Sequence, residues 1–290
     1  MKLTTISNVK SHLIPTSGGY PFPKYKSTGD NSFMFGLIMG IKNSGKSNLM
    51  LSILENEPHL LQKQNKVWFI SPTVDDKVET FIKKYPDNFI YVDGLDIETW
   101  RDTIAKVEAS VSEWKEMHKK IALLNRYLNK KTTKTLTPEE MILLEEMNYL
   151  QNVDFDKMNL EYVPINTIII DDSMGSPLIS GVSKQSKEFQ RFAIRHRHLY
   201  TNLFILSQYP KGISKVLRAN GNLLCIFPMR DHSIYQAIFP EISGLFKGRL
   251  DNLVEVMDVI EKRANHSFLT IYYDKLQYVN INFNERVDFD

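Results

Sequence analysis

The feature that most constrains the fold of this chain is a glycine-rich octet that directly follows an apolar run, Phe33 to Met39. The octet fits the pattern G-x-x-x-x-G-K-[ST] and consists of Gly40, Ile41, Lys42, Asn43, Ser44, Gly45, Lys46 and Ser47. An apolar helical stretch, Asn48 to Leu54, comes next. A strand, a glycine loop and a helix N-terminus in this order predict a phosphate-binding P-loop, because backbone N–H groups and the positive helix end then surround the phosphates.

The polar residues of the octet have expected roles in binding a nucleoside triphosphate. Lys46 is expected to reach the terminal phosphates and to take part in catalysis, and the Ser47 hydroxyl is expected to bind Mg²⁺. The alternative is an ordinary glycine-rich turn. No Asn-Lys-x-Asp motif, which reads guanine, is present in the sequence, so we expect ATP rather than GTP.

Composition limits the classes of protein to which this chain can belong. The 290 residues are enough for one large α/β domain or two small ones. The net charge is only +2, so binding to a polyanion would need a local basic patch. A single cysteine, Cys225, excludes an intrachain disulfide framework and fits a reducing compartment. Neither a signal segment nor a membrane-spanning apolar run is evident, so we expect a soluble, intracellular protein that is not secreted and has no membrane contact.

Six apolar runs separated by helical stretches predict the strands of a sheet. They are Phe33 to Met39, Lys66 to Ile70, Phe89 to Val92, Ile165 to Ile170, Leu203 to Leu206 and Leu223 to Phe227. Most are continuous rather than alternating, which is typical of parallel strands buried on both faces. Residues 266–273 and 276–283 alternate more and predict an antiparallel hairpin at the sheet edge. The predicted class is therefore an α/β P-loop NTPase with a mainly parallel sheet flanked by helices.

Residues 97–160 interrupt this alternation with a polar, helical stretch. Two helices are expected there, Glu98 to Lys130 and Pro138 to Asn152, which we interpret as an inserted helical hairpin. Its basic tip, Lys130 to Lys134, is either a solvated surface or a contact for nucleic acid or a partner. We predict one P-loop ATPase domain over residues 1–290, with the insertion inside it and an N-terminal extension at residues 1–30.

Two adjacent carboxylates, Asp171 and Asp172, follow the apolar strand Ile165 to Ile170 and have the form of a Walker B motif. Hydrolysis needs one carboxylate for hydrated Mg²⁺ and another to orient or deprotonate the attacking water. We assign Asp171 to the metal, opposite Ser47, and Asp172 to the water. The alternative is that the pair only opens a turn or caps a helix. A second pair, Asp75 and Asp76, is expected to do no more than begin a helix.

The next strand, Leu203 to Leu206, is followed by Ser207 and Gln208. An amide at this place can donate to the γ-phosphate and accept from water, so Gln208 is a candidate catalytic sensor. The alternative is a surface glutamine without a role.

A predicted helix, Lys184 to His198, places four basic residues on one face: Lys184, Lys187, Arg191 and Arg195. This face either contacts a DNA phosphate backbone, reaches the ATPase site of a neighbouring subunit, or is an ordinary solvated surface. The candidates for an arginine finger supplied between subunits are Arg195, Arg197 and Arg218. The histidines of this region, His196 and His198, lack metal-ligand spacing and are interpreted as surface or packing residues.

Together, the motifs resemble those of the FtsK–HerA superfamily of ring-forming, DNA-pumping ATPases. More narrowly, they are similar to those of the genome-packaging ATPases of large nucleocytoplasmic DNA viruses and virophages. The resemblance covers roughly Ser32 to Phe227 and is carried by the octet, Phe69 to Thr73, Ile168 to Ser173, Leu206 to Gln208, and Val216 to Asn220. The last stretch is similar to the arginine-asparagine stretch that those enzymes carry beyond the sensor glutamine.

The resemblance implies a RecA/FtsK-like fold and an ATP-hydrolysing translocase that packages a viral genome, double-stranded DNA, into a capsid. It implies a ring of identical subunits, with a hexamer expected, a capsid protein as a further partner, and a location in the host cytoplasm (virus factory) or the virion. It also implies that Asp171 and Asp172 are the Walker B pair, Gln208 the sensor and Arg218 the finger. The alternatives are a P-loop small-molecule kinase or phosphotransferase, a slow regulatory switch, and a cellular or plasmid DNA-transfer ATPase.

Overall fold

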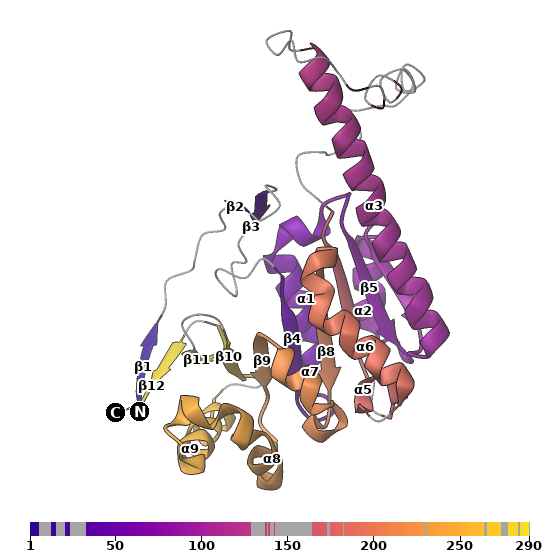
Figure 1. Cartoon of the computed structure of the whole chain (residues 1–290). Helices are drawn as coiled ribbons and strands as arrows, with labels where there is room; N and C mark the ends of the chain where they lie inside the picture. The colour runs from indigo at the N-terminus through magenta and orange to yellow at the C-terminus, as the bar shows by residue number, and fades with distance from the viewer. Residues whose placement is uncertain are drawn as a thin grey trace.

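A ten-stranded sheet runs through the centre of the molecule (Figure 1). The computed structural model describes residues 1–5, 13–15, 21–23, 33–128, 137, 139, 142, 164–172, 175–181, 183–229, 231–263, 266–273, 278–283 and 285–289. Within these residues, no helix is both long and apolar enough to cross a lipid bilayer.

The strands are β1 (Lys2–Thr5), β2 (Leu13–Pro15), β3 (Pro21–Pro23), β4 (Phe35–Met39), β5 (Lys66–Ser71), β6 (Phe89–Asp93), β7 (Asn166–Ile170), β8 (Thr201–Ser207), β9 (Leu223–Ile226), β10 (Leu269–Tyr272), β11 (Tyr278–Ile281) and β12 (Glu285–Asp288). The α-helices are α1 (Lys46–Asn56), α2 (Asp76–Lys84), α3 (Ile97–Leu128), α5 (Pro177–Ser180), α6 (Lys184–Arg195), α7 (Lys215–Asn220), α8 (His232–Ile242) and α9 (Leu250–Glu261). The 3₁₀ helices are η1 (Pro58–Leu61), η4 (His196–Leu199), η5 (Pro210–Gly212) and η6 (Ser243–Phe246).

The strand order is β1-β12-β11-β10-β9-β4-β8-β7-β5-β6, and the stretch from β9 to β6 is parallel. The strands from β10 to β1 are antiparallel to their neighbours. The predicted mainly parallel sheet and C-terminal hairpin, β10 with β11, are therefore confirmed. Two further strands, β12 and β1, were not predicted, and their pairing brings the two ends of the chain together (Figure 1).

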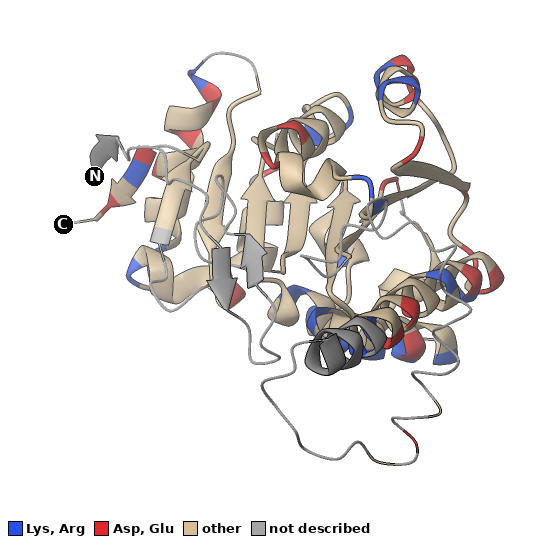
Figure 2. Cartoon of the chain, turned by 90° about the horizontal axis from the view of Figure 1, so that it is seen from above, with Lys and Arg blue, Asp and Glu red and all other residues tan. Residues whose placement is uncertain are grey.

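Helices cover both faces of the sheet, which explains why the strands read as continuous apolar runs. On one face, β4 residues such as Phe35 and Leu37 pack with the apolar sides of α3, α6, α8 and α9. On the other face, Ile38 packs with α1 and α2. Figure 2 shows the charged residues on the outer helices, while the strands at the centre carry almost none.

The helical insertion begins as predicted with one long helix, α3, which runs 32 residues and continues well past the sheet (Figure 1). Its first half is held by Trp100, whose ring centroid lies 4.6 Å from that of Phe189 and 5.0 Å from that of Phe192 on α6. The second predicted helix, Pro138 to Asn152, and the basic tip lie almost wholly outside the described residues.

The predicted helix Lys184 to His198 is shorter than expected, because α6 ends at Arg195. The chain continues as the 3₁₀ turn η4, and Tyr200 then adopts a left-handed conformation with φ of 49°. The turn buries the His196 ring, which is 3 % exposed, so that its Nδ1 lies 2.6 Å from the Thr201 carbonyl oxygen. His196 is therefore a packing residue, as the sequence indicates.

Candidate nucleotide-binding site

The octet forms a loop between β4 and α1, and its turn requires left-handed backbone at two positions. These are Asn43, with φ of 62°, and Gly45, with φ of 105°. At Gly40 the chain has no room for a side chain, since a Cβ would lie 2.5 Å from the Ser44 hydroxyl oxygen and 2.8 Å from Phe227 Cβ. Gly45 is therefore required for its left-handed backbone conformation, and Gly40 for the close approach of neighbouring atoms.

The Lys46 side chain is buried beneath this loop and donates hydrogen bonds to its carbonyl oxygens. Its Nζ lies 2.9 Å from the Gly40 oxygen and 3.0 Å from the Ile41 oxygen. Burial lowers the pKa of Lys46, and the nearby carboxylates Asp171 and Asp172 oppose this shift. A lysine held in this way can stabilise added negative charge at the loop.

The Ser47 hydroxyl donates to the Asp171 carboxylate, with 2.8 Å between Oγ and Oδ2. Burial raises the pKa of Asp171, while the bonds from Ser47 and from the Asp172 amide lower it. A hydroxyl and a single carboxylate fit Mg²⁺, which prefers oxygen ligands and usually completes its shell with waters and substrate phosphates. The described residues contain no cluster of three or more His, Cys, Asp or Glu side chains arranged to hold a metal.

Asp172 and Gln208 are 36 residues apart in sequence but meet through a side-chain hydrogen bond. Gln208 Nε2 donates to Asp172 Oδ1 over 3.0 Å. Asp172 has φ of 48°, a left-handed conformation that is uncommon outside glycine, although asparagine and aspartate adopt it more often than most residues. The turn after β7 therefore directs the two aspartates differently, with Asp171 towards Ser47 and Asp172 towards Gln208.

Topology brings these residues together, because β4, β8 and β7 are consecutive in the sheet and parallel. The octet, Gln208 and the aspartates each follow one of these strands, so all lie at the same edge of the sheet. This edge is where ligands bind in open α/β sheets.

The basic face of α6 is exposed, and part of it is paired with α3. Lys184, Lys187, Arg191 and Arg195 are all exposed. Arg195 donates to Glu108 over 3.0 Å, and Glu188, on the same helix, accepts two bonds from Arg101. Arg195 and Arg197 lie near the amino end of β8, the strand whose carboxyl end carries Gln208. The structure therefore does not bring these two arginines to the site of their own chain.

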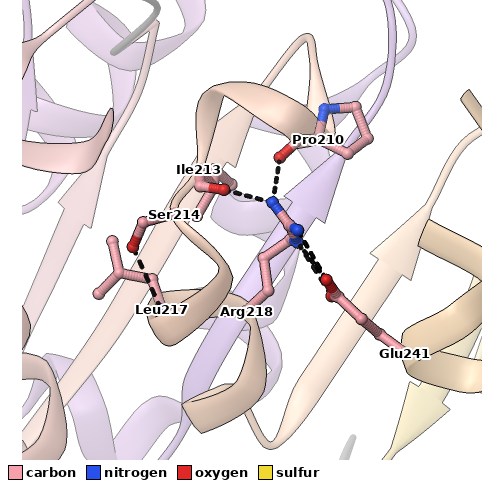
Figure 3. A network of polar contacts seen from close by, with 6 residues as sticks. All are labelled: Pro210, Ile213, Ser214, Leu217, Arg218 and Glu241. Carbon is pink, nitrogen blue, oxygen red and sulfur yellow. Dashed lines mark hydrogen bonds and ion pairs between the residues drawn. The ribbon is translucent and has the colours of Figure 1, made fainter. Parts of the chain in front are cut away.

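Arg218, the third finger candidate, is engaged within its own chain (Figure 3). Its guanidinium forms a double ion pair with Glu241, with 2.6 Å between Nη2 and Oε1 and 2.9 Å between Nε and Oε2. It also donates to the carbonyl oxygens of Pro210, at 3.1 Å, and Ile213. These contacts join α7 and α8 to the segment that follows Gln208, so Arg218 organises that segment.

Residues beyond the predicted motifs also reach the octet, from the C-terminal part of the chain. His266 Nδ1 donates to the Ser44 carbonyl oxygen over 2.8 Å, and a Cβ at Gly45 would lie 2.9 Å from the same nitrogen. His266 precedes β10, and the sequence predicts it only as the start of a strand. No local pattern distinguishes such a residue, since its contact depends on how the sheet orders its strands.

Comparisons with known proteins show the fold. No protein-family profile and no curated protein matches the sequence. The structure is similar to that of B204, the DNA-packaging ATPase of Sulfolobus turreted icosahedral virus, with a TM-score of 0.50, 13 % identity, and coverage of 86 % of this chain and 96 % of that one. B204 of Sulfolobus turreted icosahedral virus 2 with bound sulfate gives a TM-score of 0.50, 12 % identity, and coverage of 87 % and 97 %.

A third solved structure, the pCW3 conjugation coupling protein TcpA, matches with a TM-score of 0.45 and 13 % identity over 94 % of this chain and 65 % of that one. The similarity to the two B204 structures shows a shared fold.

Proposed function

We propose that this protein is an ATP-hydrolysing translocase that packages double-stranded DNA into a viral capsid. One observation carries the proposal. Five polar residues lie together at the carboxyl ends of the parallel strands: Lys46, Ser47, Asp171, Asp172 and Gln208. The fold that holds them is similar to that of a viral DNA-packaging ATPase. The basic face of α6 supports the choice of a polyanion as the second substrate.

In the proposed reaction, the octet backbone and the α1 N-terminus hold the triphosphate, and Lys46 pairs with its terminal oxygens. Asp172 accepts a proton from a water molecule as the water oxygen bonds to the γ-phosphorus. The bond between this phosphorus and the β–γ bridging oxygen breaks, so that ADP leaves. Ser47 and Asp171 would hold Mg²⁺, which neutralises charge on the β- and γ-phosphates. Gln208 senses the γ-phosphate, and its hydrogen bond to Asp172 supports this role.

The remaining parts of the proposal concern assembly. We infer one P-loop ATPase domain over residues 1–290, with an N-terminal extension (1–30) and the helical insertion (97–160). The subunits form a ring, a hexamer by resemblance, and Arg195 or Arg197 of one subunit is the better placed finger because Arg218 is engaged within its own chain. A capsid protein is a further partner, and the host cytoplasm or the virion is the location.

The test is the steady-state ATPase rate with and without double-stranded DNA, measured over a range of protein concentrations. If the protein is a packaging motor, its ATPase rate should rise with both DNA and protein concentration. Lys46→Ala should abolish turnover, whereas Lys63→Ala, at an exposed lysine outside the site, should not change it. Turnover retained in Lys46→Ala would overturn the P-loop assignment. A rate independent of both DNA and protein concentration would favour the small-molecule kinase or switch, and DNA stimulation without capsid binding would favour a cellular or plasmid transfer ATPase.

A further inference from the structure

Both glycines of the octet lie against side chains from the C-terminal part of the chain. A Cβ at Gly40 would lie 2.8 Å from Phe227 Cβ, and a Cβ at Gly45 would lie 2.9 Å from His266 Nδ1. Phe227 follows β9 and His266 precedes β10, and these two strands are neighbours in the sheet. The two ends of the octet are therefore supported by segments that are far from it in the sequence.

The segment that carries His266 is anchored two residues further on, at Phe268. The buried Phe268 ring has its centroid 5.2 Å from that of Phe227 and 5.3 Å from that of Phe283. The Phe268 amide donates to the Asn282 side chain over 3.1 Å, and the Asn282 amide donates to the Phe268 carbonyl over 2.7 Å. His266 itself is exposed, so apolar burial does not bring its ring to the octet. The anchored segment and a hydrogen bond of the ring hold it there.

This hydrogen bond acts on the peptide between Ser44 and Gly45. His266 Nδ1 lies 2.8 Å from the Ser44 carbonyl oxygen, and Nδ1 carries the hydrogen because a carbonyl oxygen can only accept. The peptide is planar and trans, so the Gly45 N–H points to the side opposite that carbonyl. The Gly45 N–H donates to no other described residue, whereas the Ser44 N–H donates to the Ile41 carbonyl over 3.2 Å. The bond from His266 therefore fixes the direction of a backbone donor that is still available to a ligand.

The backbone at Gly45 offers little resistance to rotation of this peptide. Gly45 has φ of 105°, and glycine populates positive and negative φ about equally readily. A rotated peptide would present the Ser44 carbonyl oxygen, instead of the Gly45 N–H, to an anion held by the octet. An external hydrogen bond to the carbonyl is therefore needed to favour the orientation that binds phosphate.

We propose that His266 is a positioning residue of the phosphate site, which holds the peptide between Ser44 and Gly45 so that the Gly45 N–H faces the phosphates. The inference rests on the proposed function, since it requires a nucleotide in the octet. His266 acts through the loop and not on the phosphates themselves. The antiparallel edge of the sheet then takes part in phosphate binding.

The test measures the affinities of the full chain and two variants for ATP and for inorganic tripolyphosphate, both with Mg²⁺, by calorimetry. His266→Gly removes the donor, and His266→Asn keeps it, because the amide nitrogen of asparagine can take the place of Nδ1. Both residues accept the φ of 74° at this position, so backbone strain does not distinguish them. We expect His266→Gly to bind both compounds about tenfold less tightly, as for the loss of one hydrogen bond to a charged group. His266→Asn should stay within about threefold of the unaltered protein.

A spectroscopic measurement distinguishes positioning from a general effect on the fold. In protein labelled with ¹⁵N-glycine, tripolyphosphate should shift the Gly45 amide resonance of the unaltered protein and of His266→Asn. The shift should be much smaller in His266→Gly, while the resonances of glycines outside the octet stay in place. Displacement of those other resonances in His266→Gly without ligand would indicate a structural role and would overturn the inference.

The remaining outcomes separate this inference from the proposed function. Unchanged affinities in His266→Gly, or equal losses in His266→Gly and His266→Asn, would overturn the positioning role and leave the P-loop assignment intact. A loss confined to ATP, with tripolyphosphate binding unchanged, would also overturn it, because the effect would then not pass through the phosphates. Binding of neither compound by the unaltered protein would overturn the proposed function as well.

Discussion

At the scale of single residues, burial and hydrogen bonding act in opposite directions on the ionisable groups of the candidate site. Burial disfavours the charged forms, so it lowers the pKa of Lys46 and raises that of Asp171. Their mutual attraction opposes both shifts, and the hydrogen bond from Ser47 further opposes the rise in the pKa of Asp171. Because these charges are already held in place, little reorganisation is needed when a nucleotide and its metal bind.

The two aspartates should respond differently to substitution. Asp172→Asn should leave ATP binding intact and lower the hydrolysis rate by on the order of 10²–10⁴-fold, because an amide cannot accept the proton of the attacking water. Nucleotide affinity and single-turnover hydrolysis, measured on the same preparation, check this. Asp171→Asn is the comparison and should weaken Mg²⁺-dependent binding. The reverse result would exchange the roles of the two carboxylates.

His196 should make the stability of the fold depend on pH. Burial lowers its pKa from 6.5 to about 4, so the folded state disfavours the proton that the unfolded chain binds. The stability that results is fully present above the unfolded pKa and is lost as pH falls towards the folded one. Between about pH 7.5 and about pH 5 this loss should reach about 2 kcal/mol.

Denaturant unfolding at the two pH values provides the measurement. His196→Asn keeps an N–H donor near Thr201 and should remove this part of the pH dependence, whereas His198→Asn, at an exposed residue, should keep it. Identical pH profiles for the unaltered protein and His196→Asn would show that other groups cause the loss.

At the scale of elements, one ion pair connects the segment after β8 to the helices beside it. Arg218 on α7 joins Glu241 on α8 to the carbonyl oxygens of Pro210 and Ile213, with Arg218 14 % and Glu241 23 % exposed (Figure 3). Gln208 lies just before this segment. The ion pair adds to the packing of the buried residues Ile213 and Leu217, and so helps to fix the path of the chain that leaves the candidate site.

Arg218→Met should therefore lower the free energy of unfolding by about 2 kcal/mol, the usual cost of losing hydrogen bonds to a charged group. Arg218→Met combined with Glu241→Met should recover part of the loss, since no carboxylate is then left unpaired. Lys215→Met, at an exposed residue of the same helix, is the control. If Arg218→Met instead melted normally but lost ATPase activity, the arginine finger role would be favoured.

At the scale of the whole molecule, the edge of the sheet that carries the octet is separate from the outer helix surfaces that a large partner can contact. The α6 basic face lies on the side of the sheet that also carries α3, and α1 and α2 lie on the other. On the proposed function, this arrangement would let DNA contact α6 without covering the octet. The strands β7 and β8 lie on either side of α6 in the chain.

Charge reversal tests this surface. Lys187→Glu with Arg191→Glu should weaken DNA binding and reduce the slope of log affinity against log salt concentration by about 2, because two phosphate contacts are lost. Lys63→Glu with Lys77→Glu makes the same change in net charge at exposed residues outside α6 and should have a much smaller effect. Equal slopes for both double variants would identify the α6 face as an ordinary solvated surface.

The sequence by itself determined the fold class, the parallel strands and the residues at their ends. Local pattern is sufficient there, because a strand buried on both faces is apolar throughout and a P-loop requires glycines at fixed positions. The Asp75 side chain, which accepts bonds from the Lys77 and Val78 amides at the start of α2, is another feature that local pattern predicts.

Only the tertiary structure decided which side chains meet. The bonds of Gln208 with Asp172, Arg218 with Glu241 and His266 with Ser44 join residues 36, 23 and 222 positions apart. No local periodicity encodes such contacts, because they depend on the order of strands in the sheet. For the same reason the sequence could not show that Arg218 is engaged within its own chain.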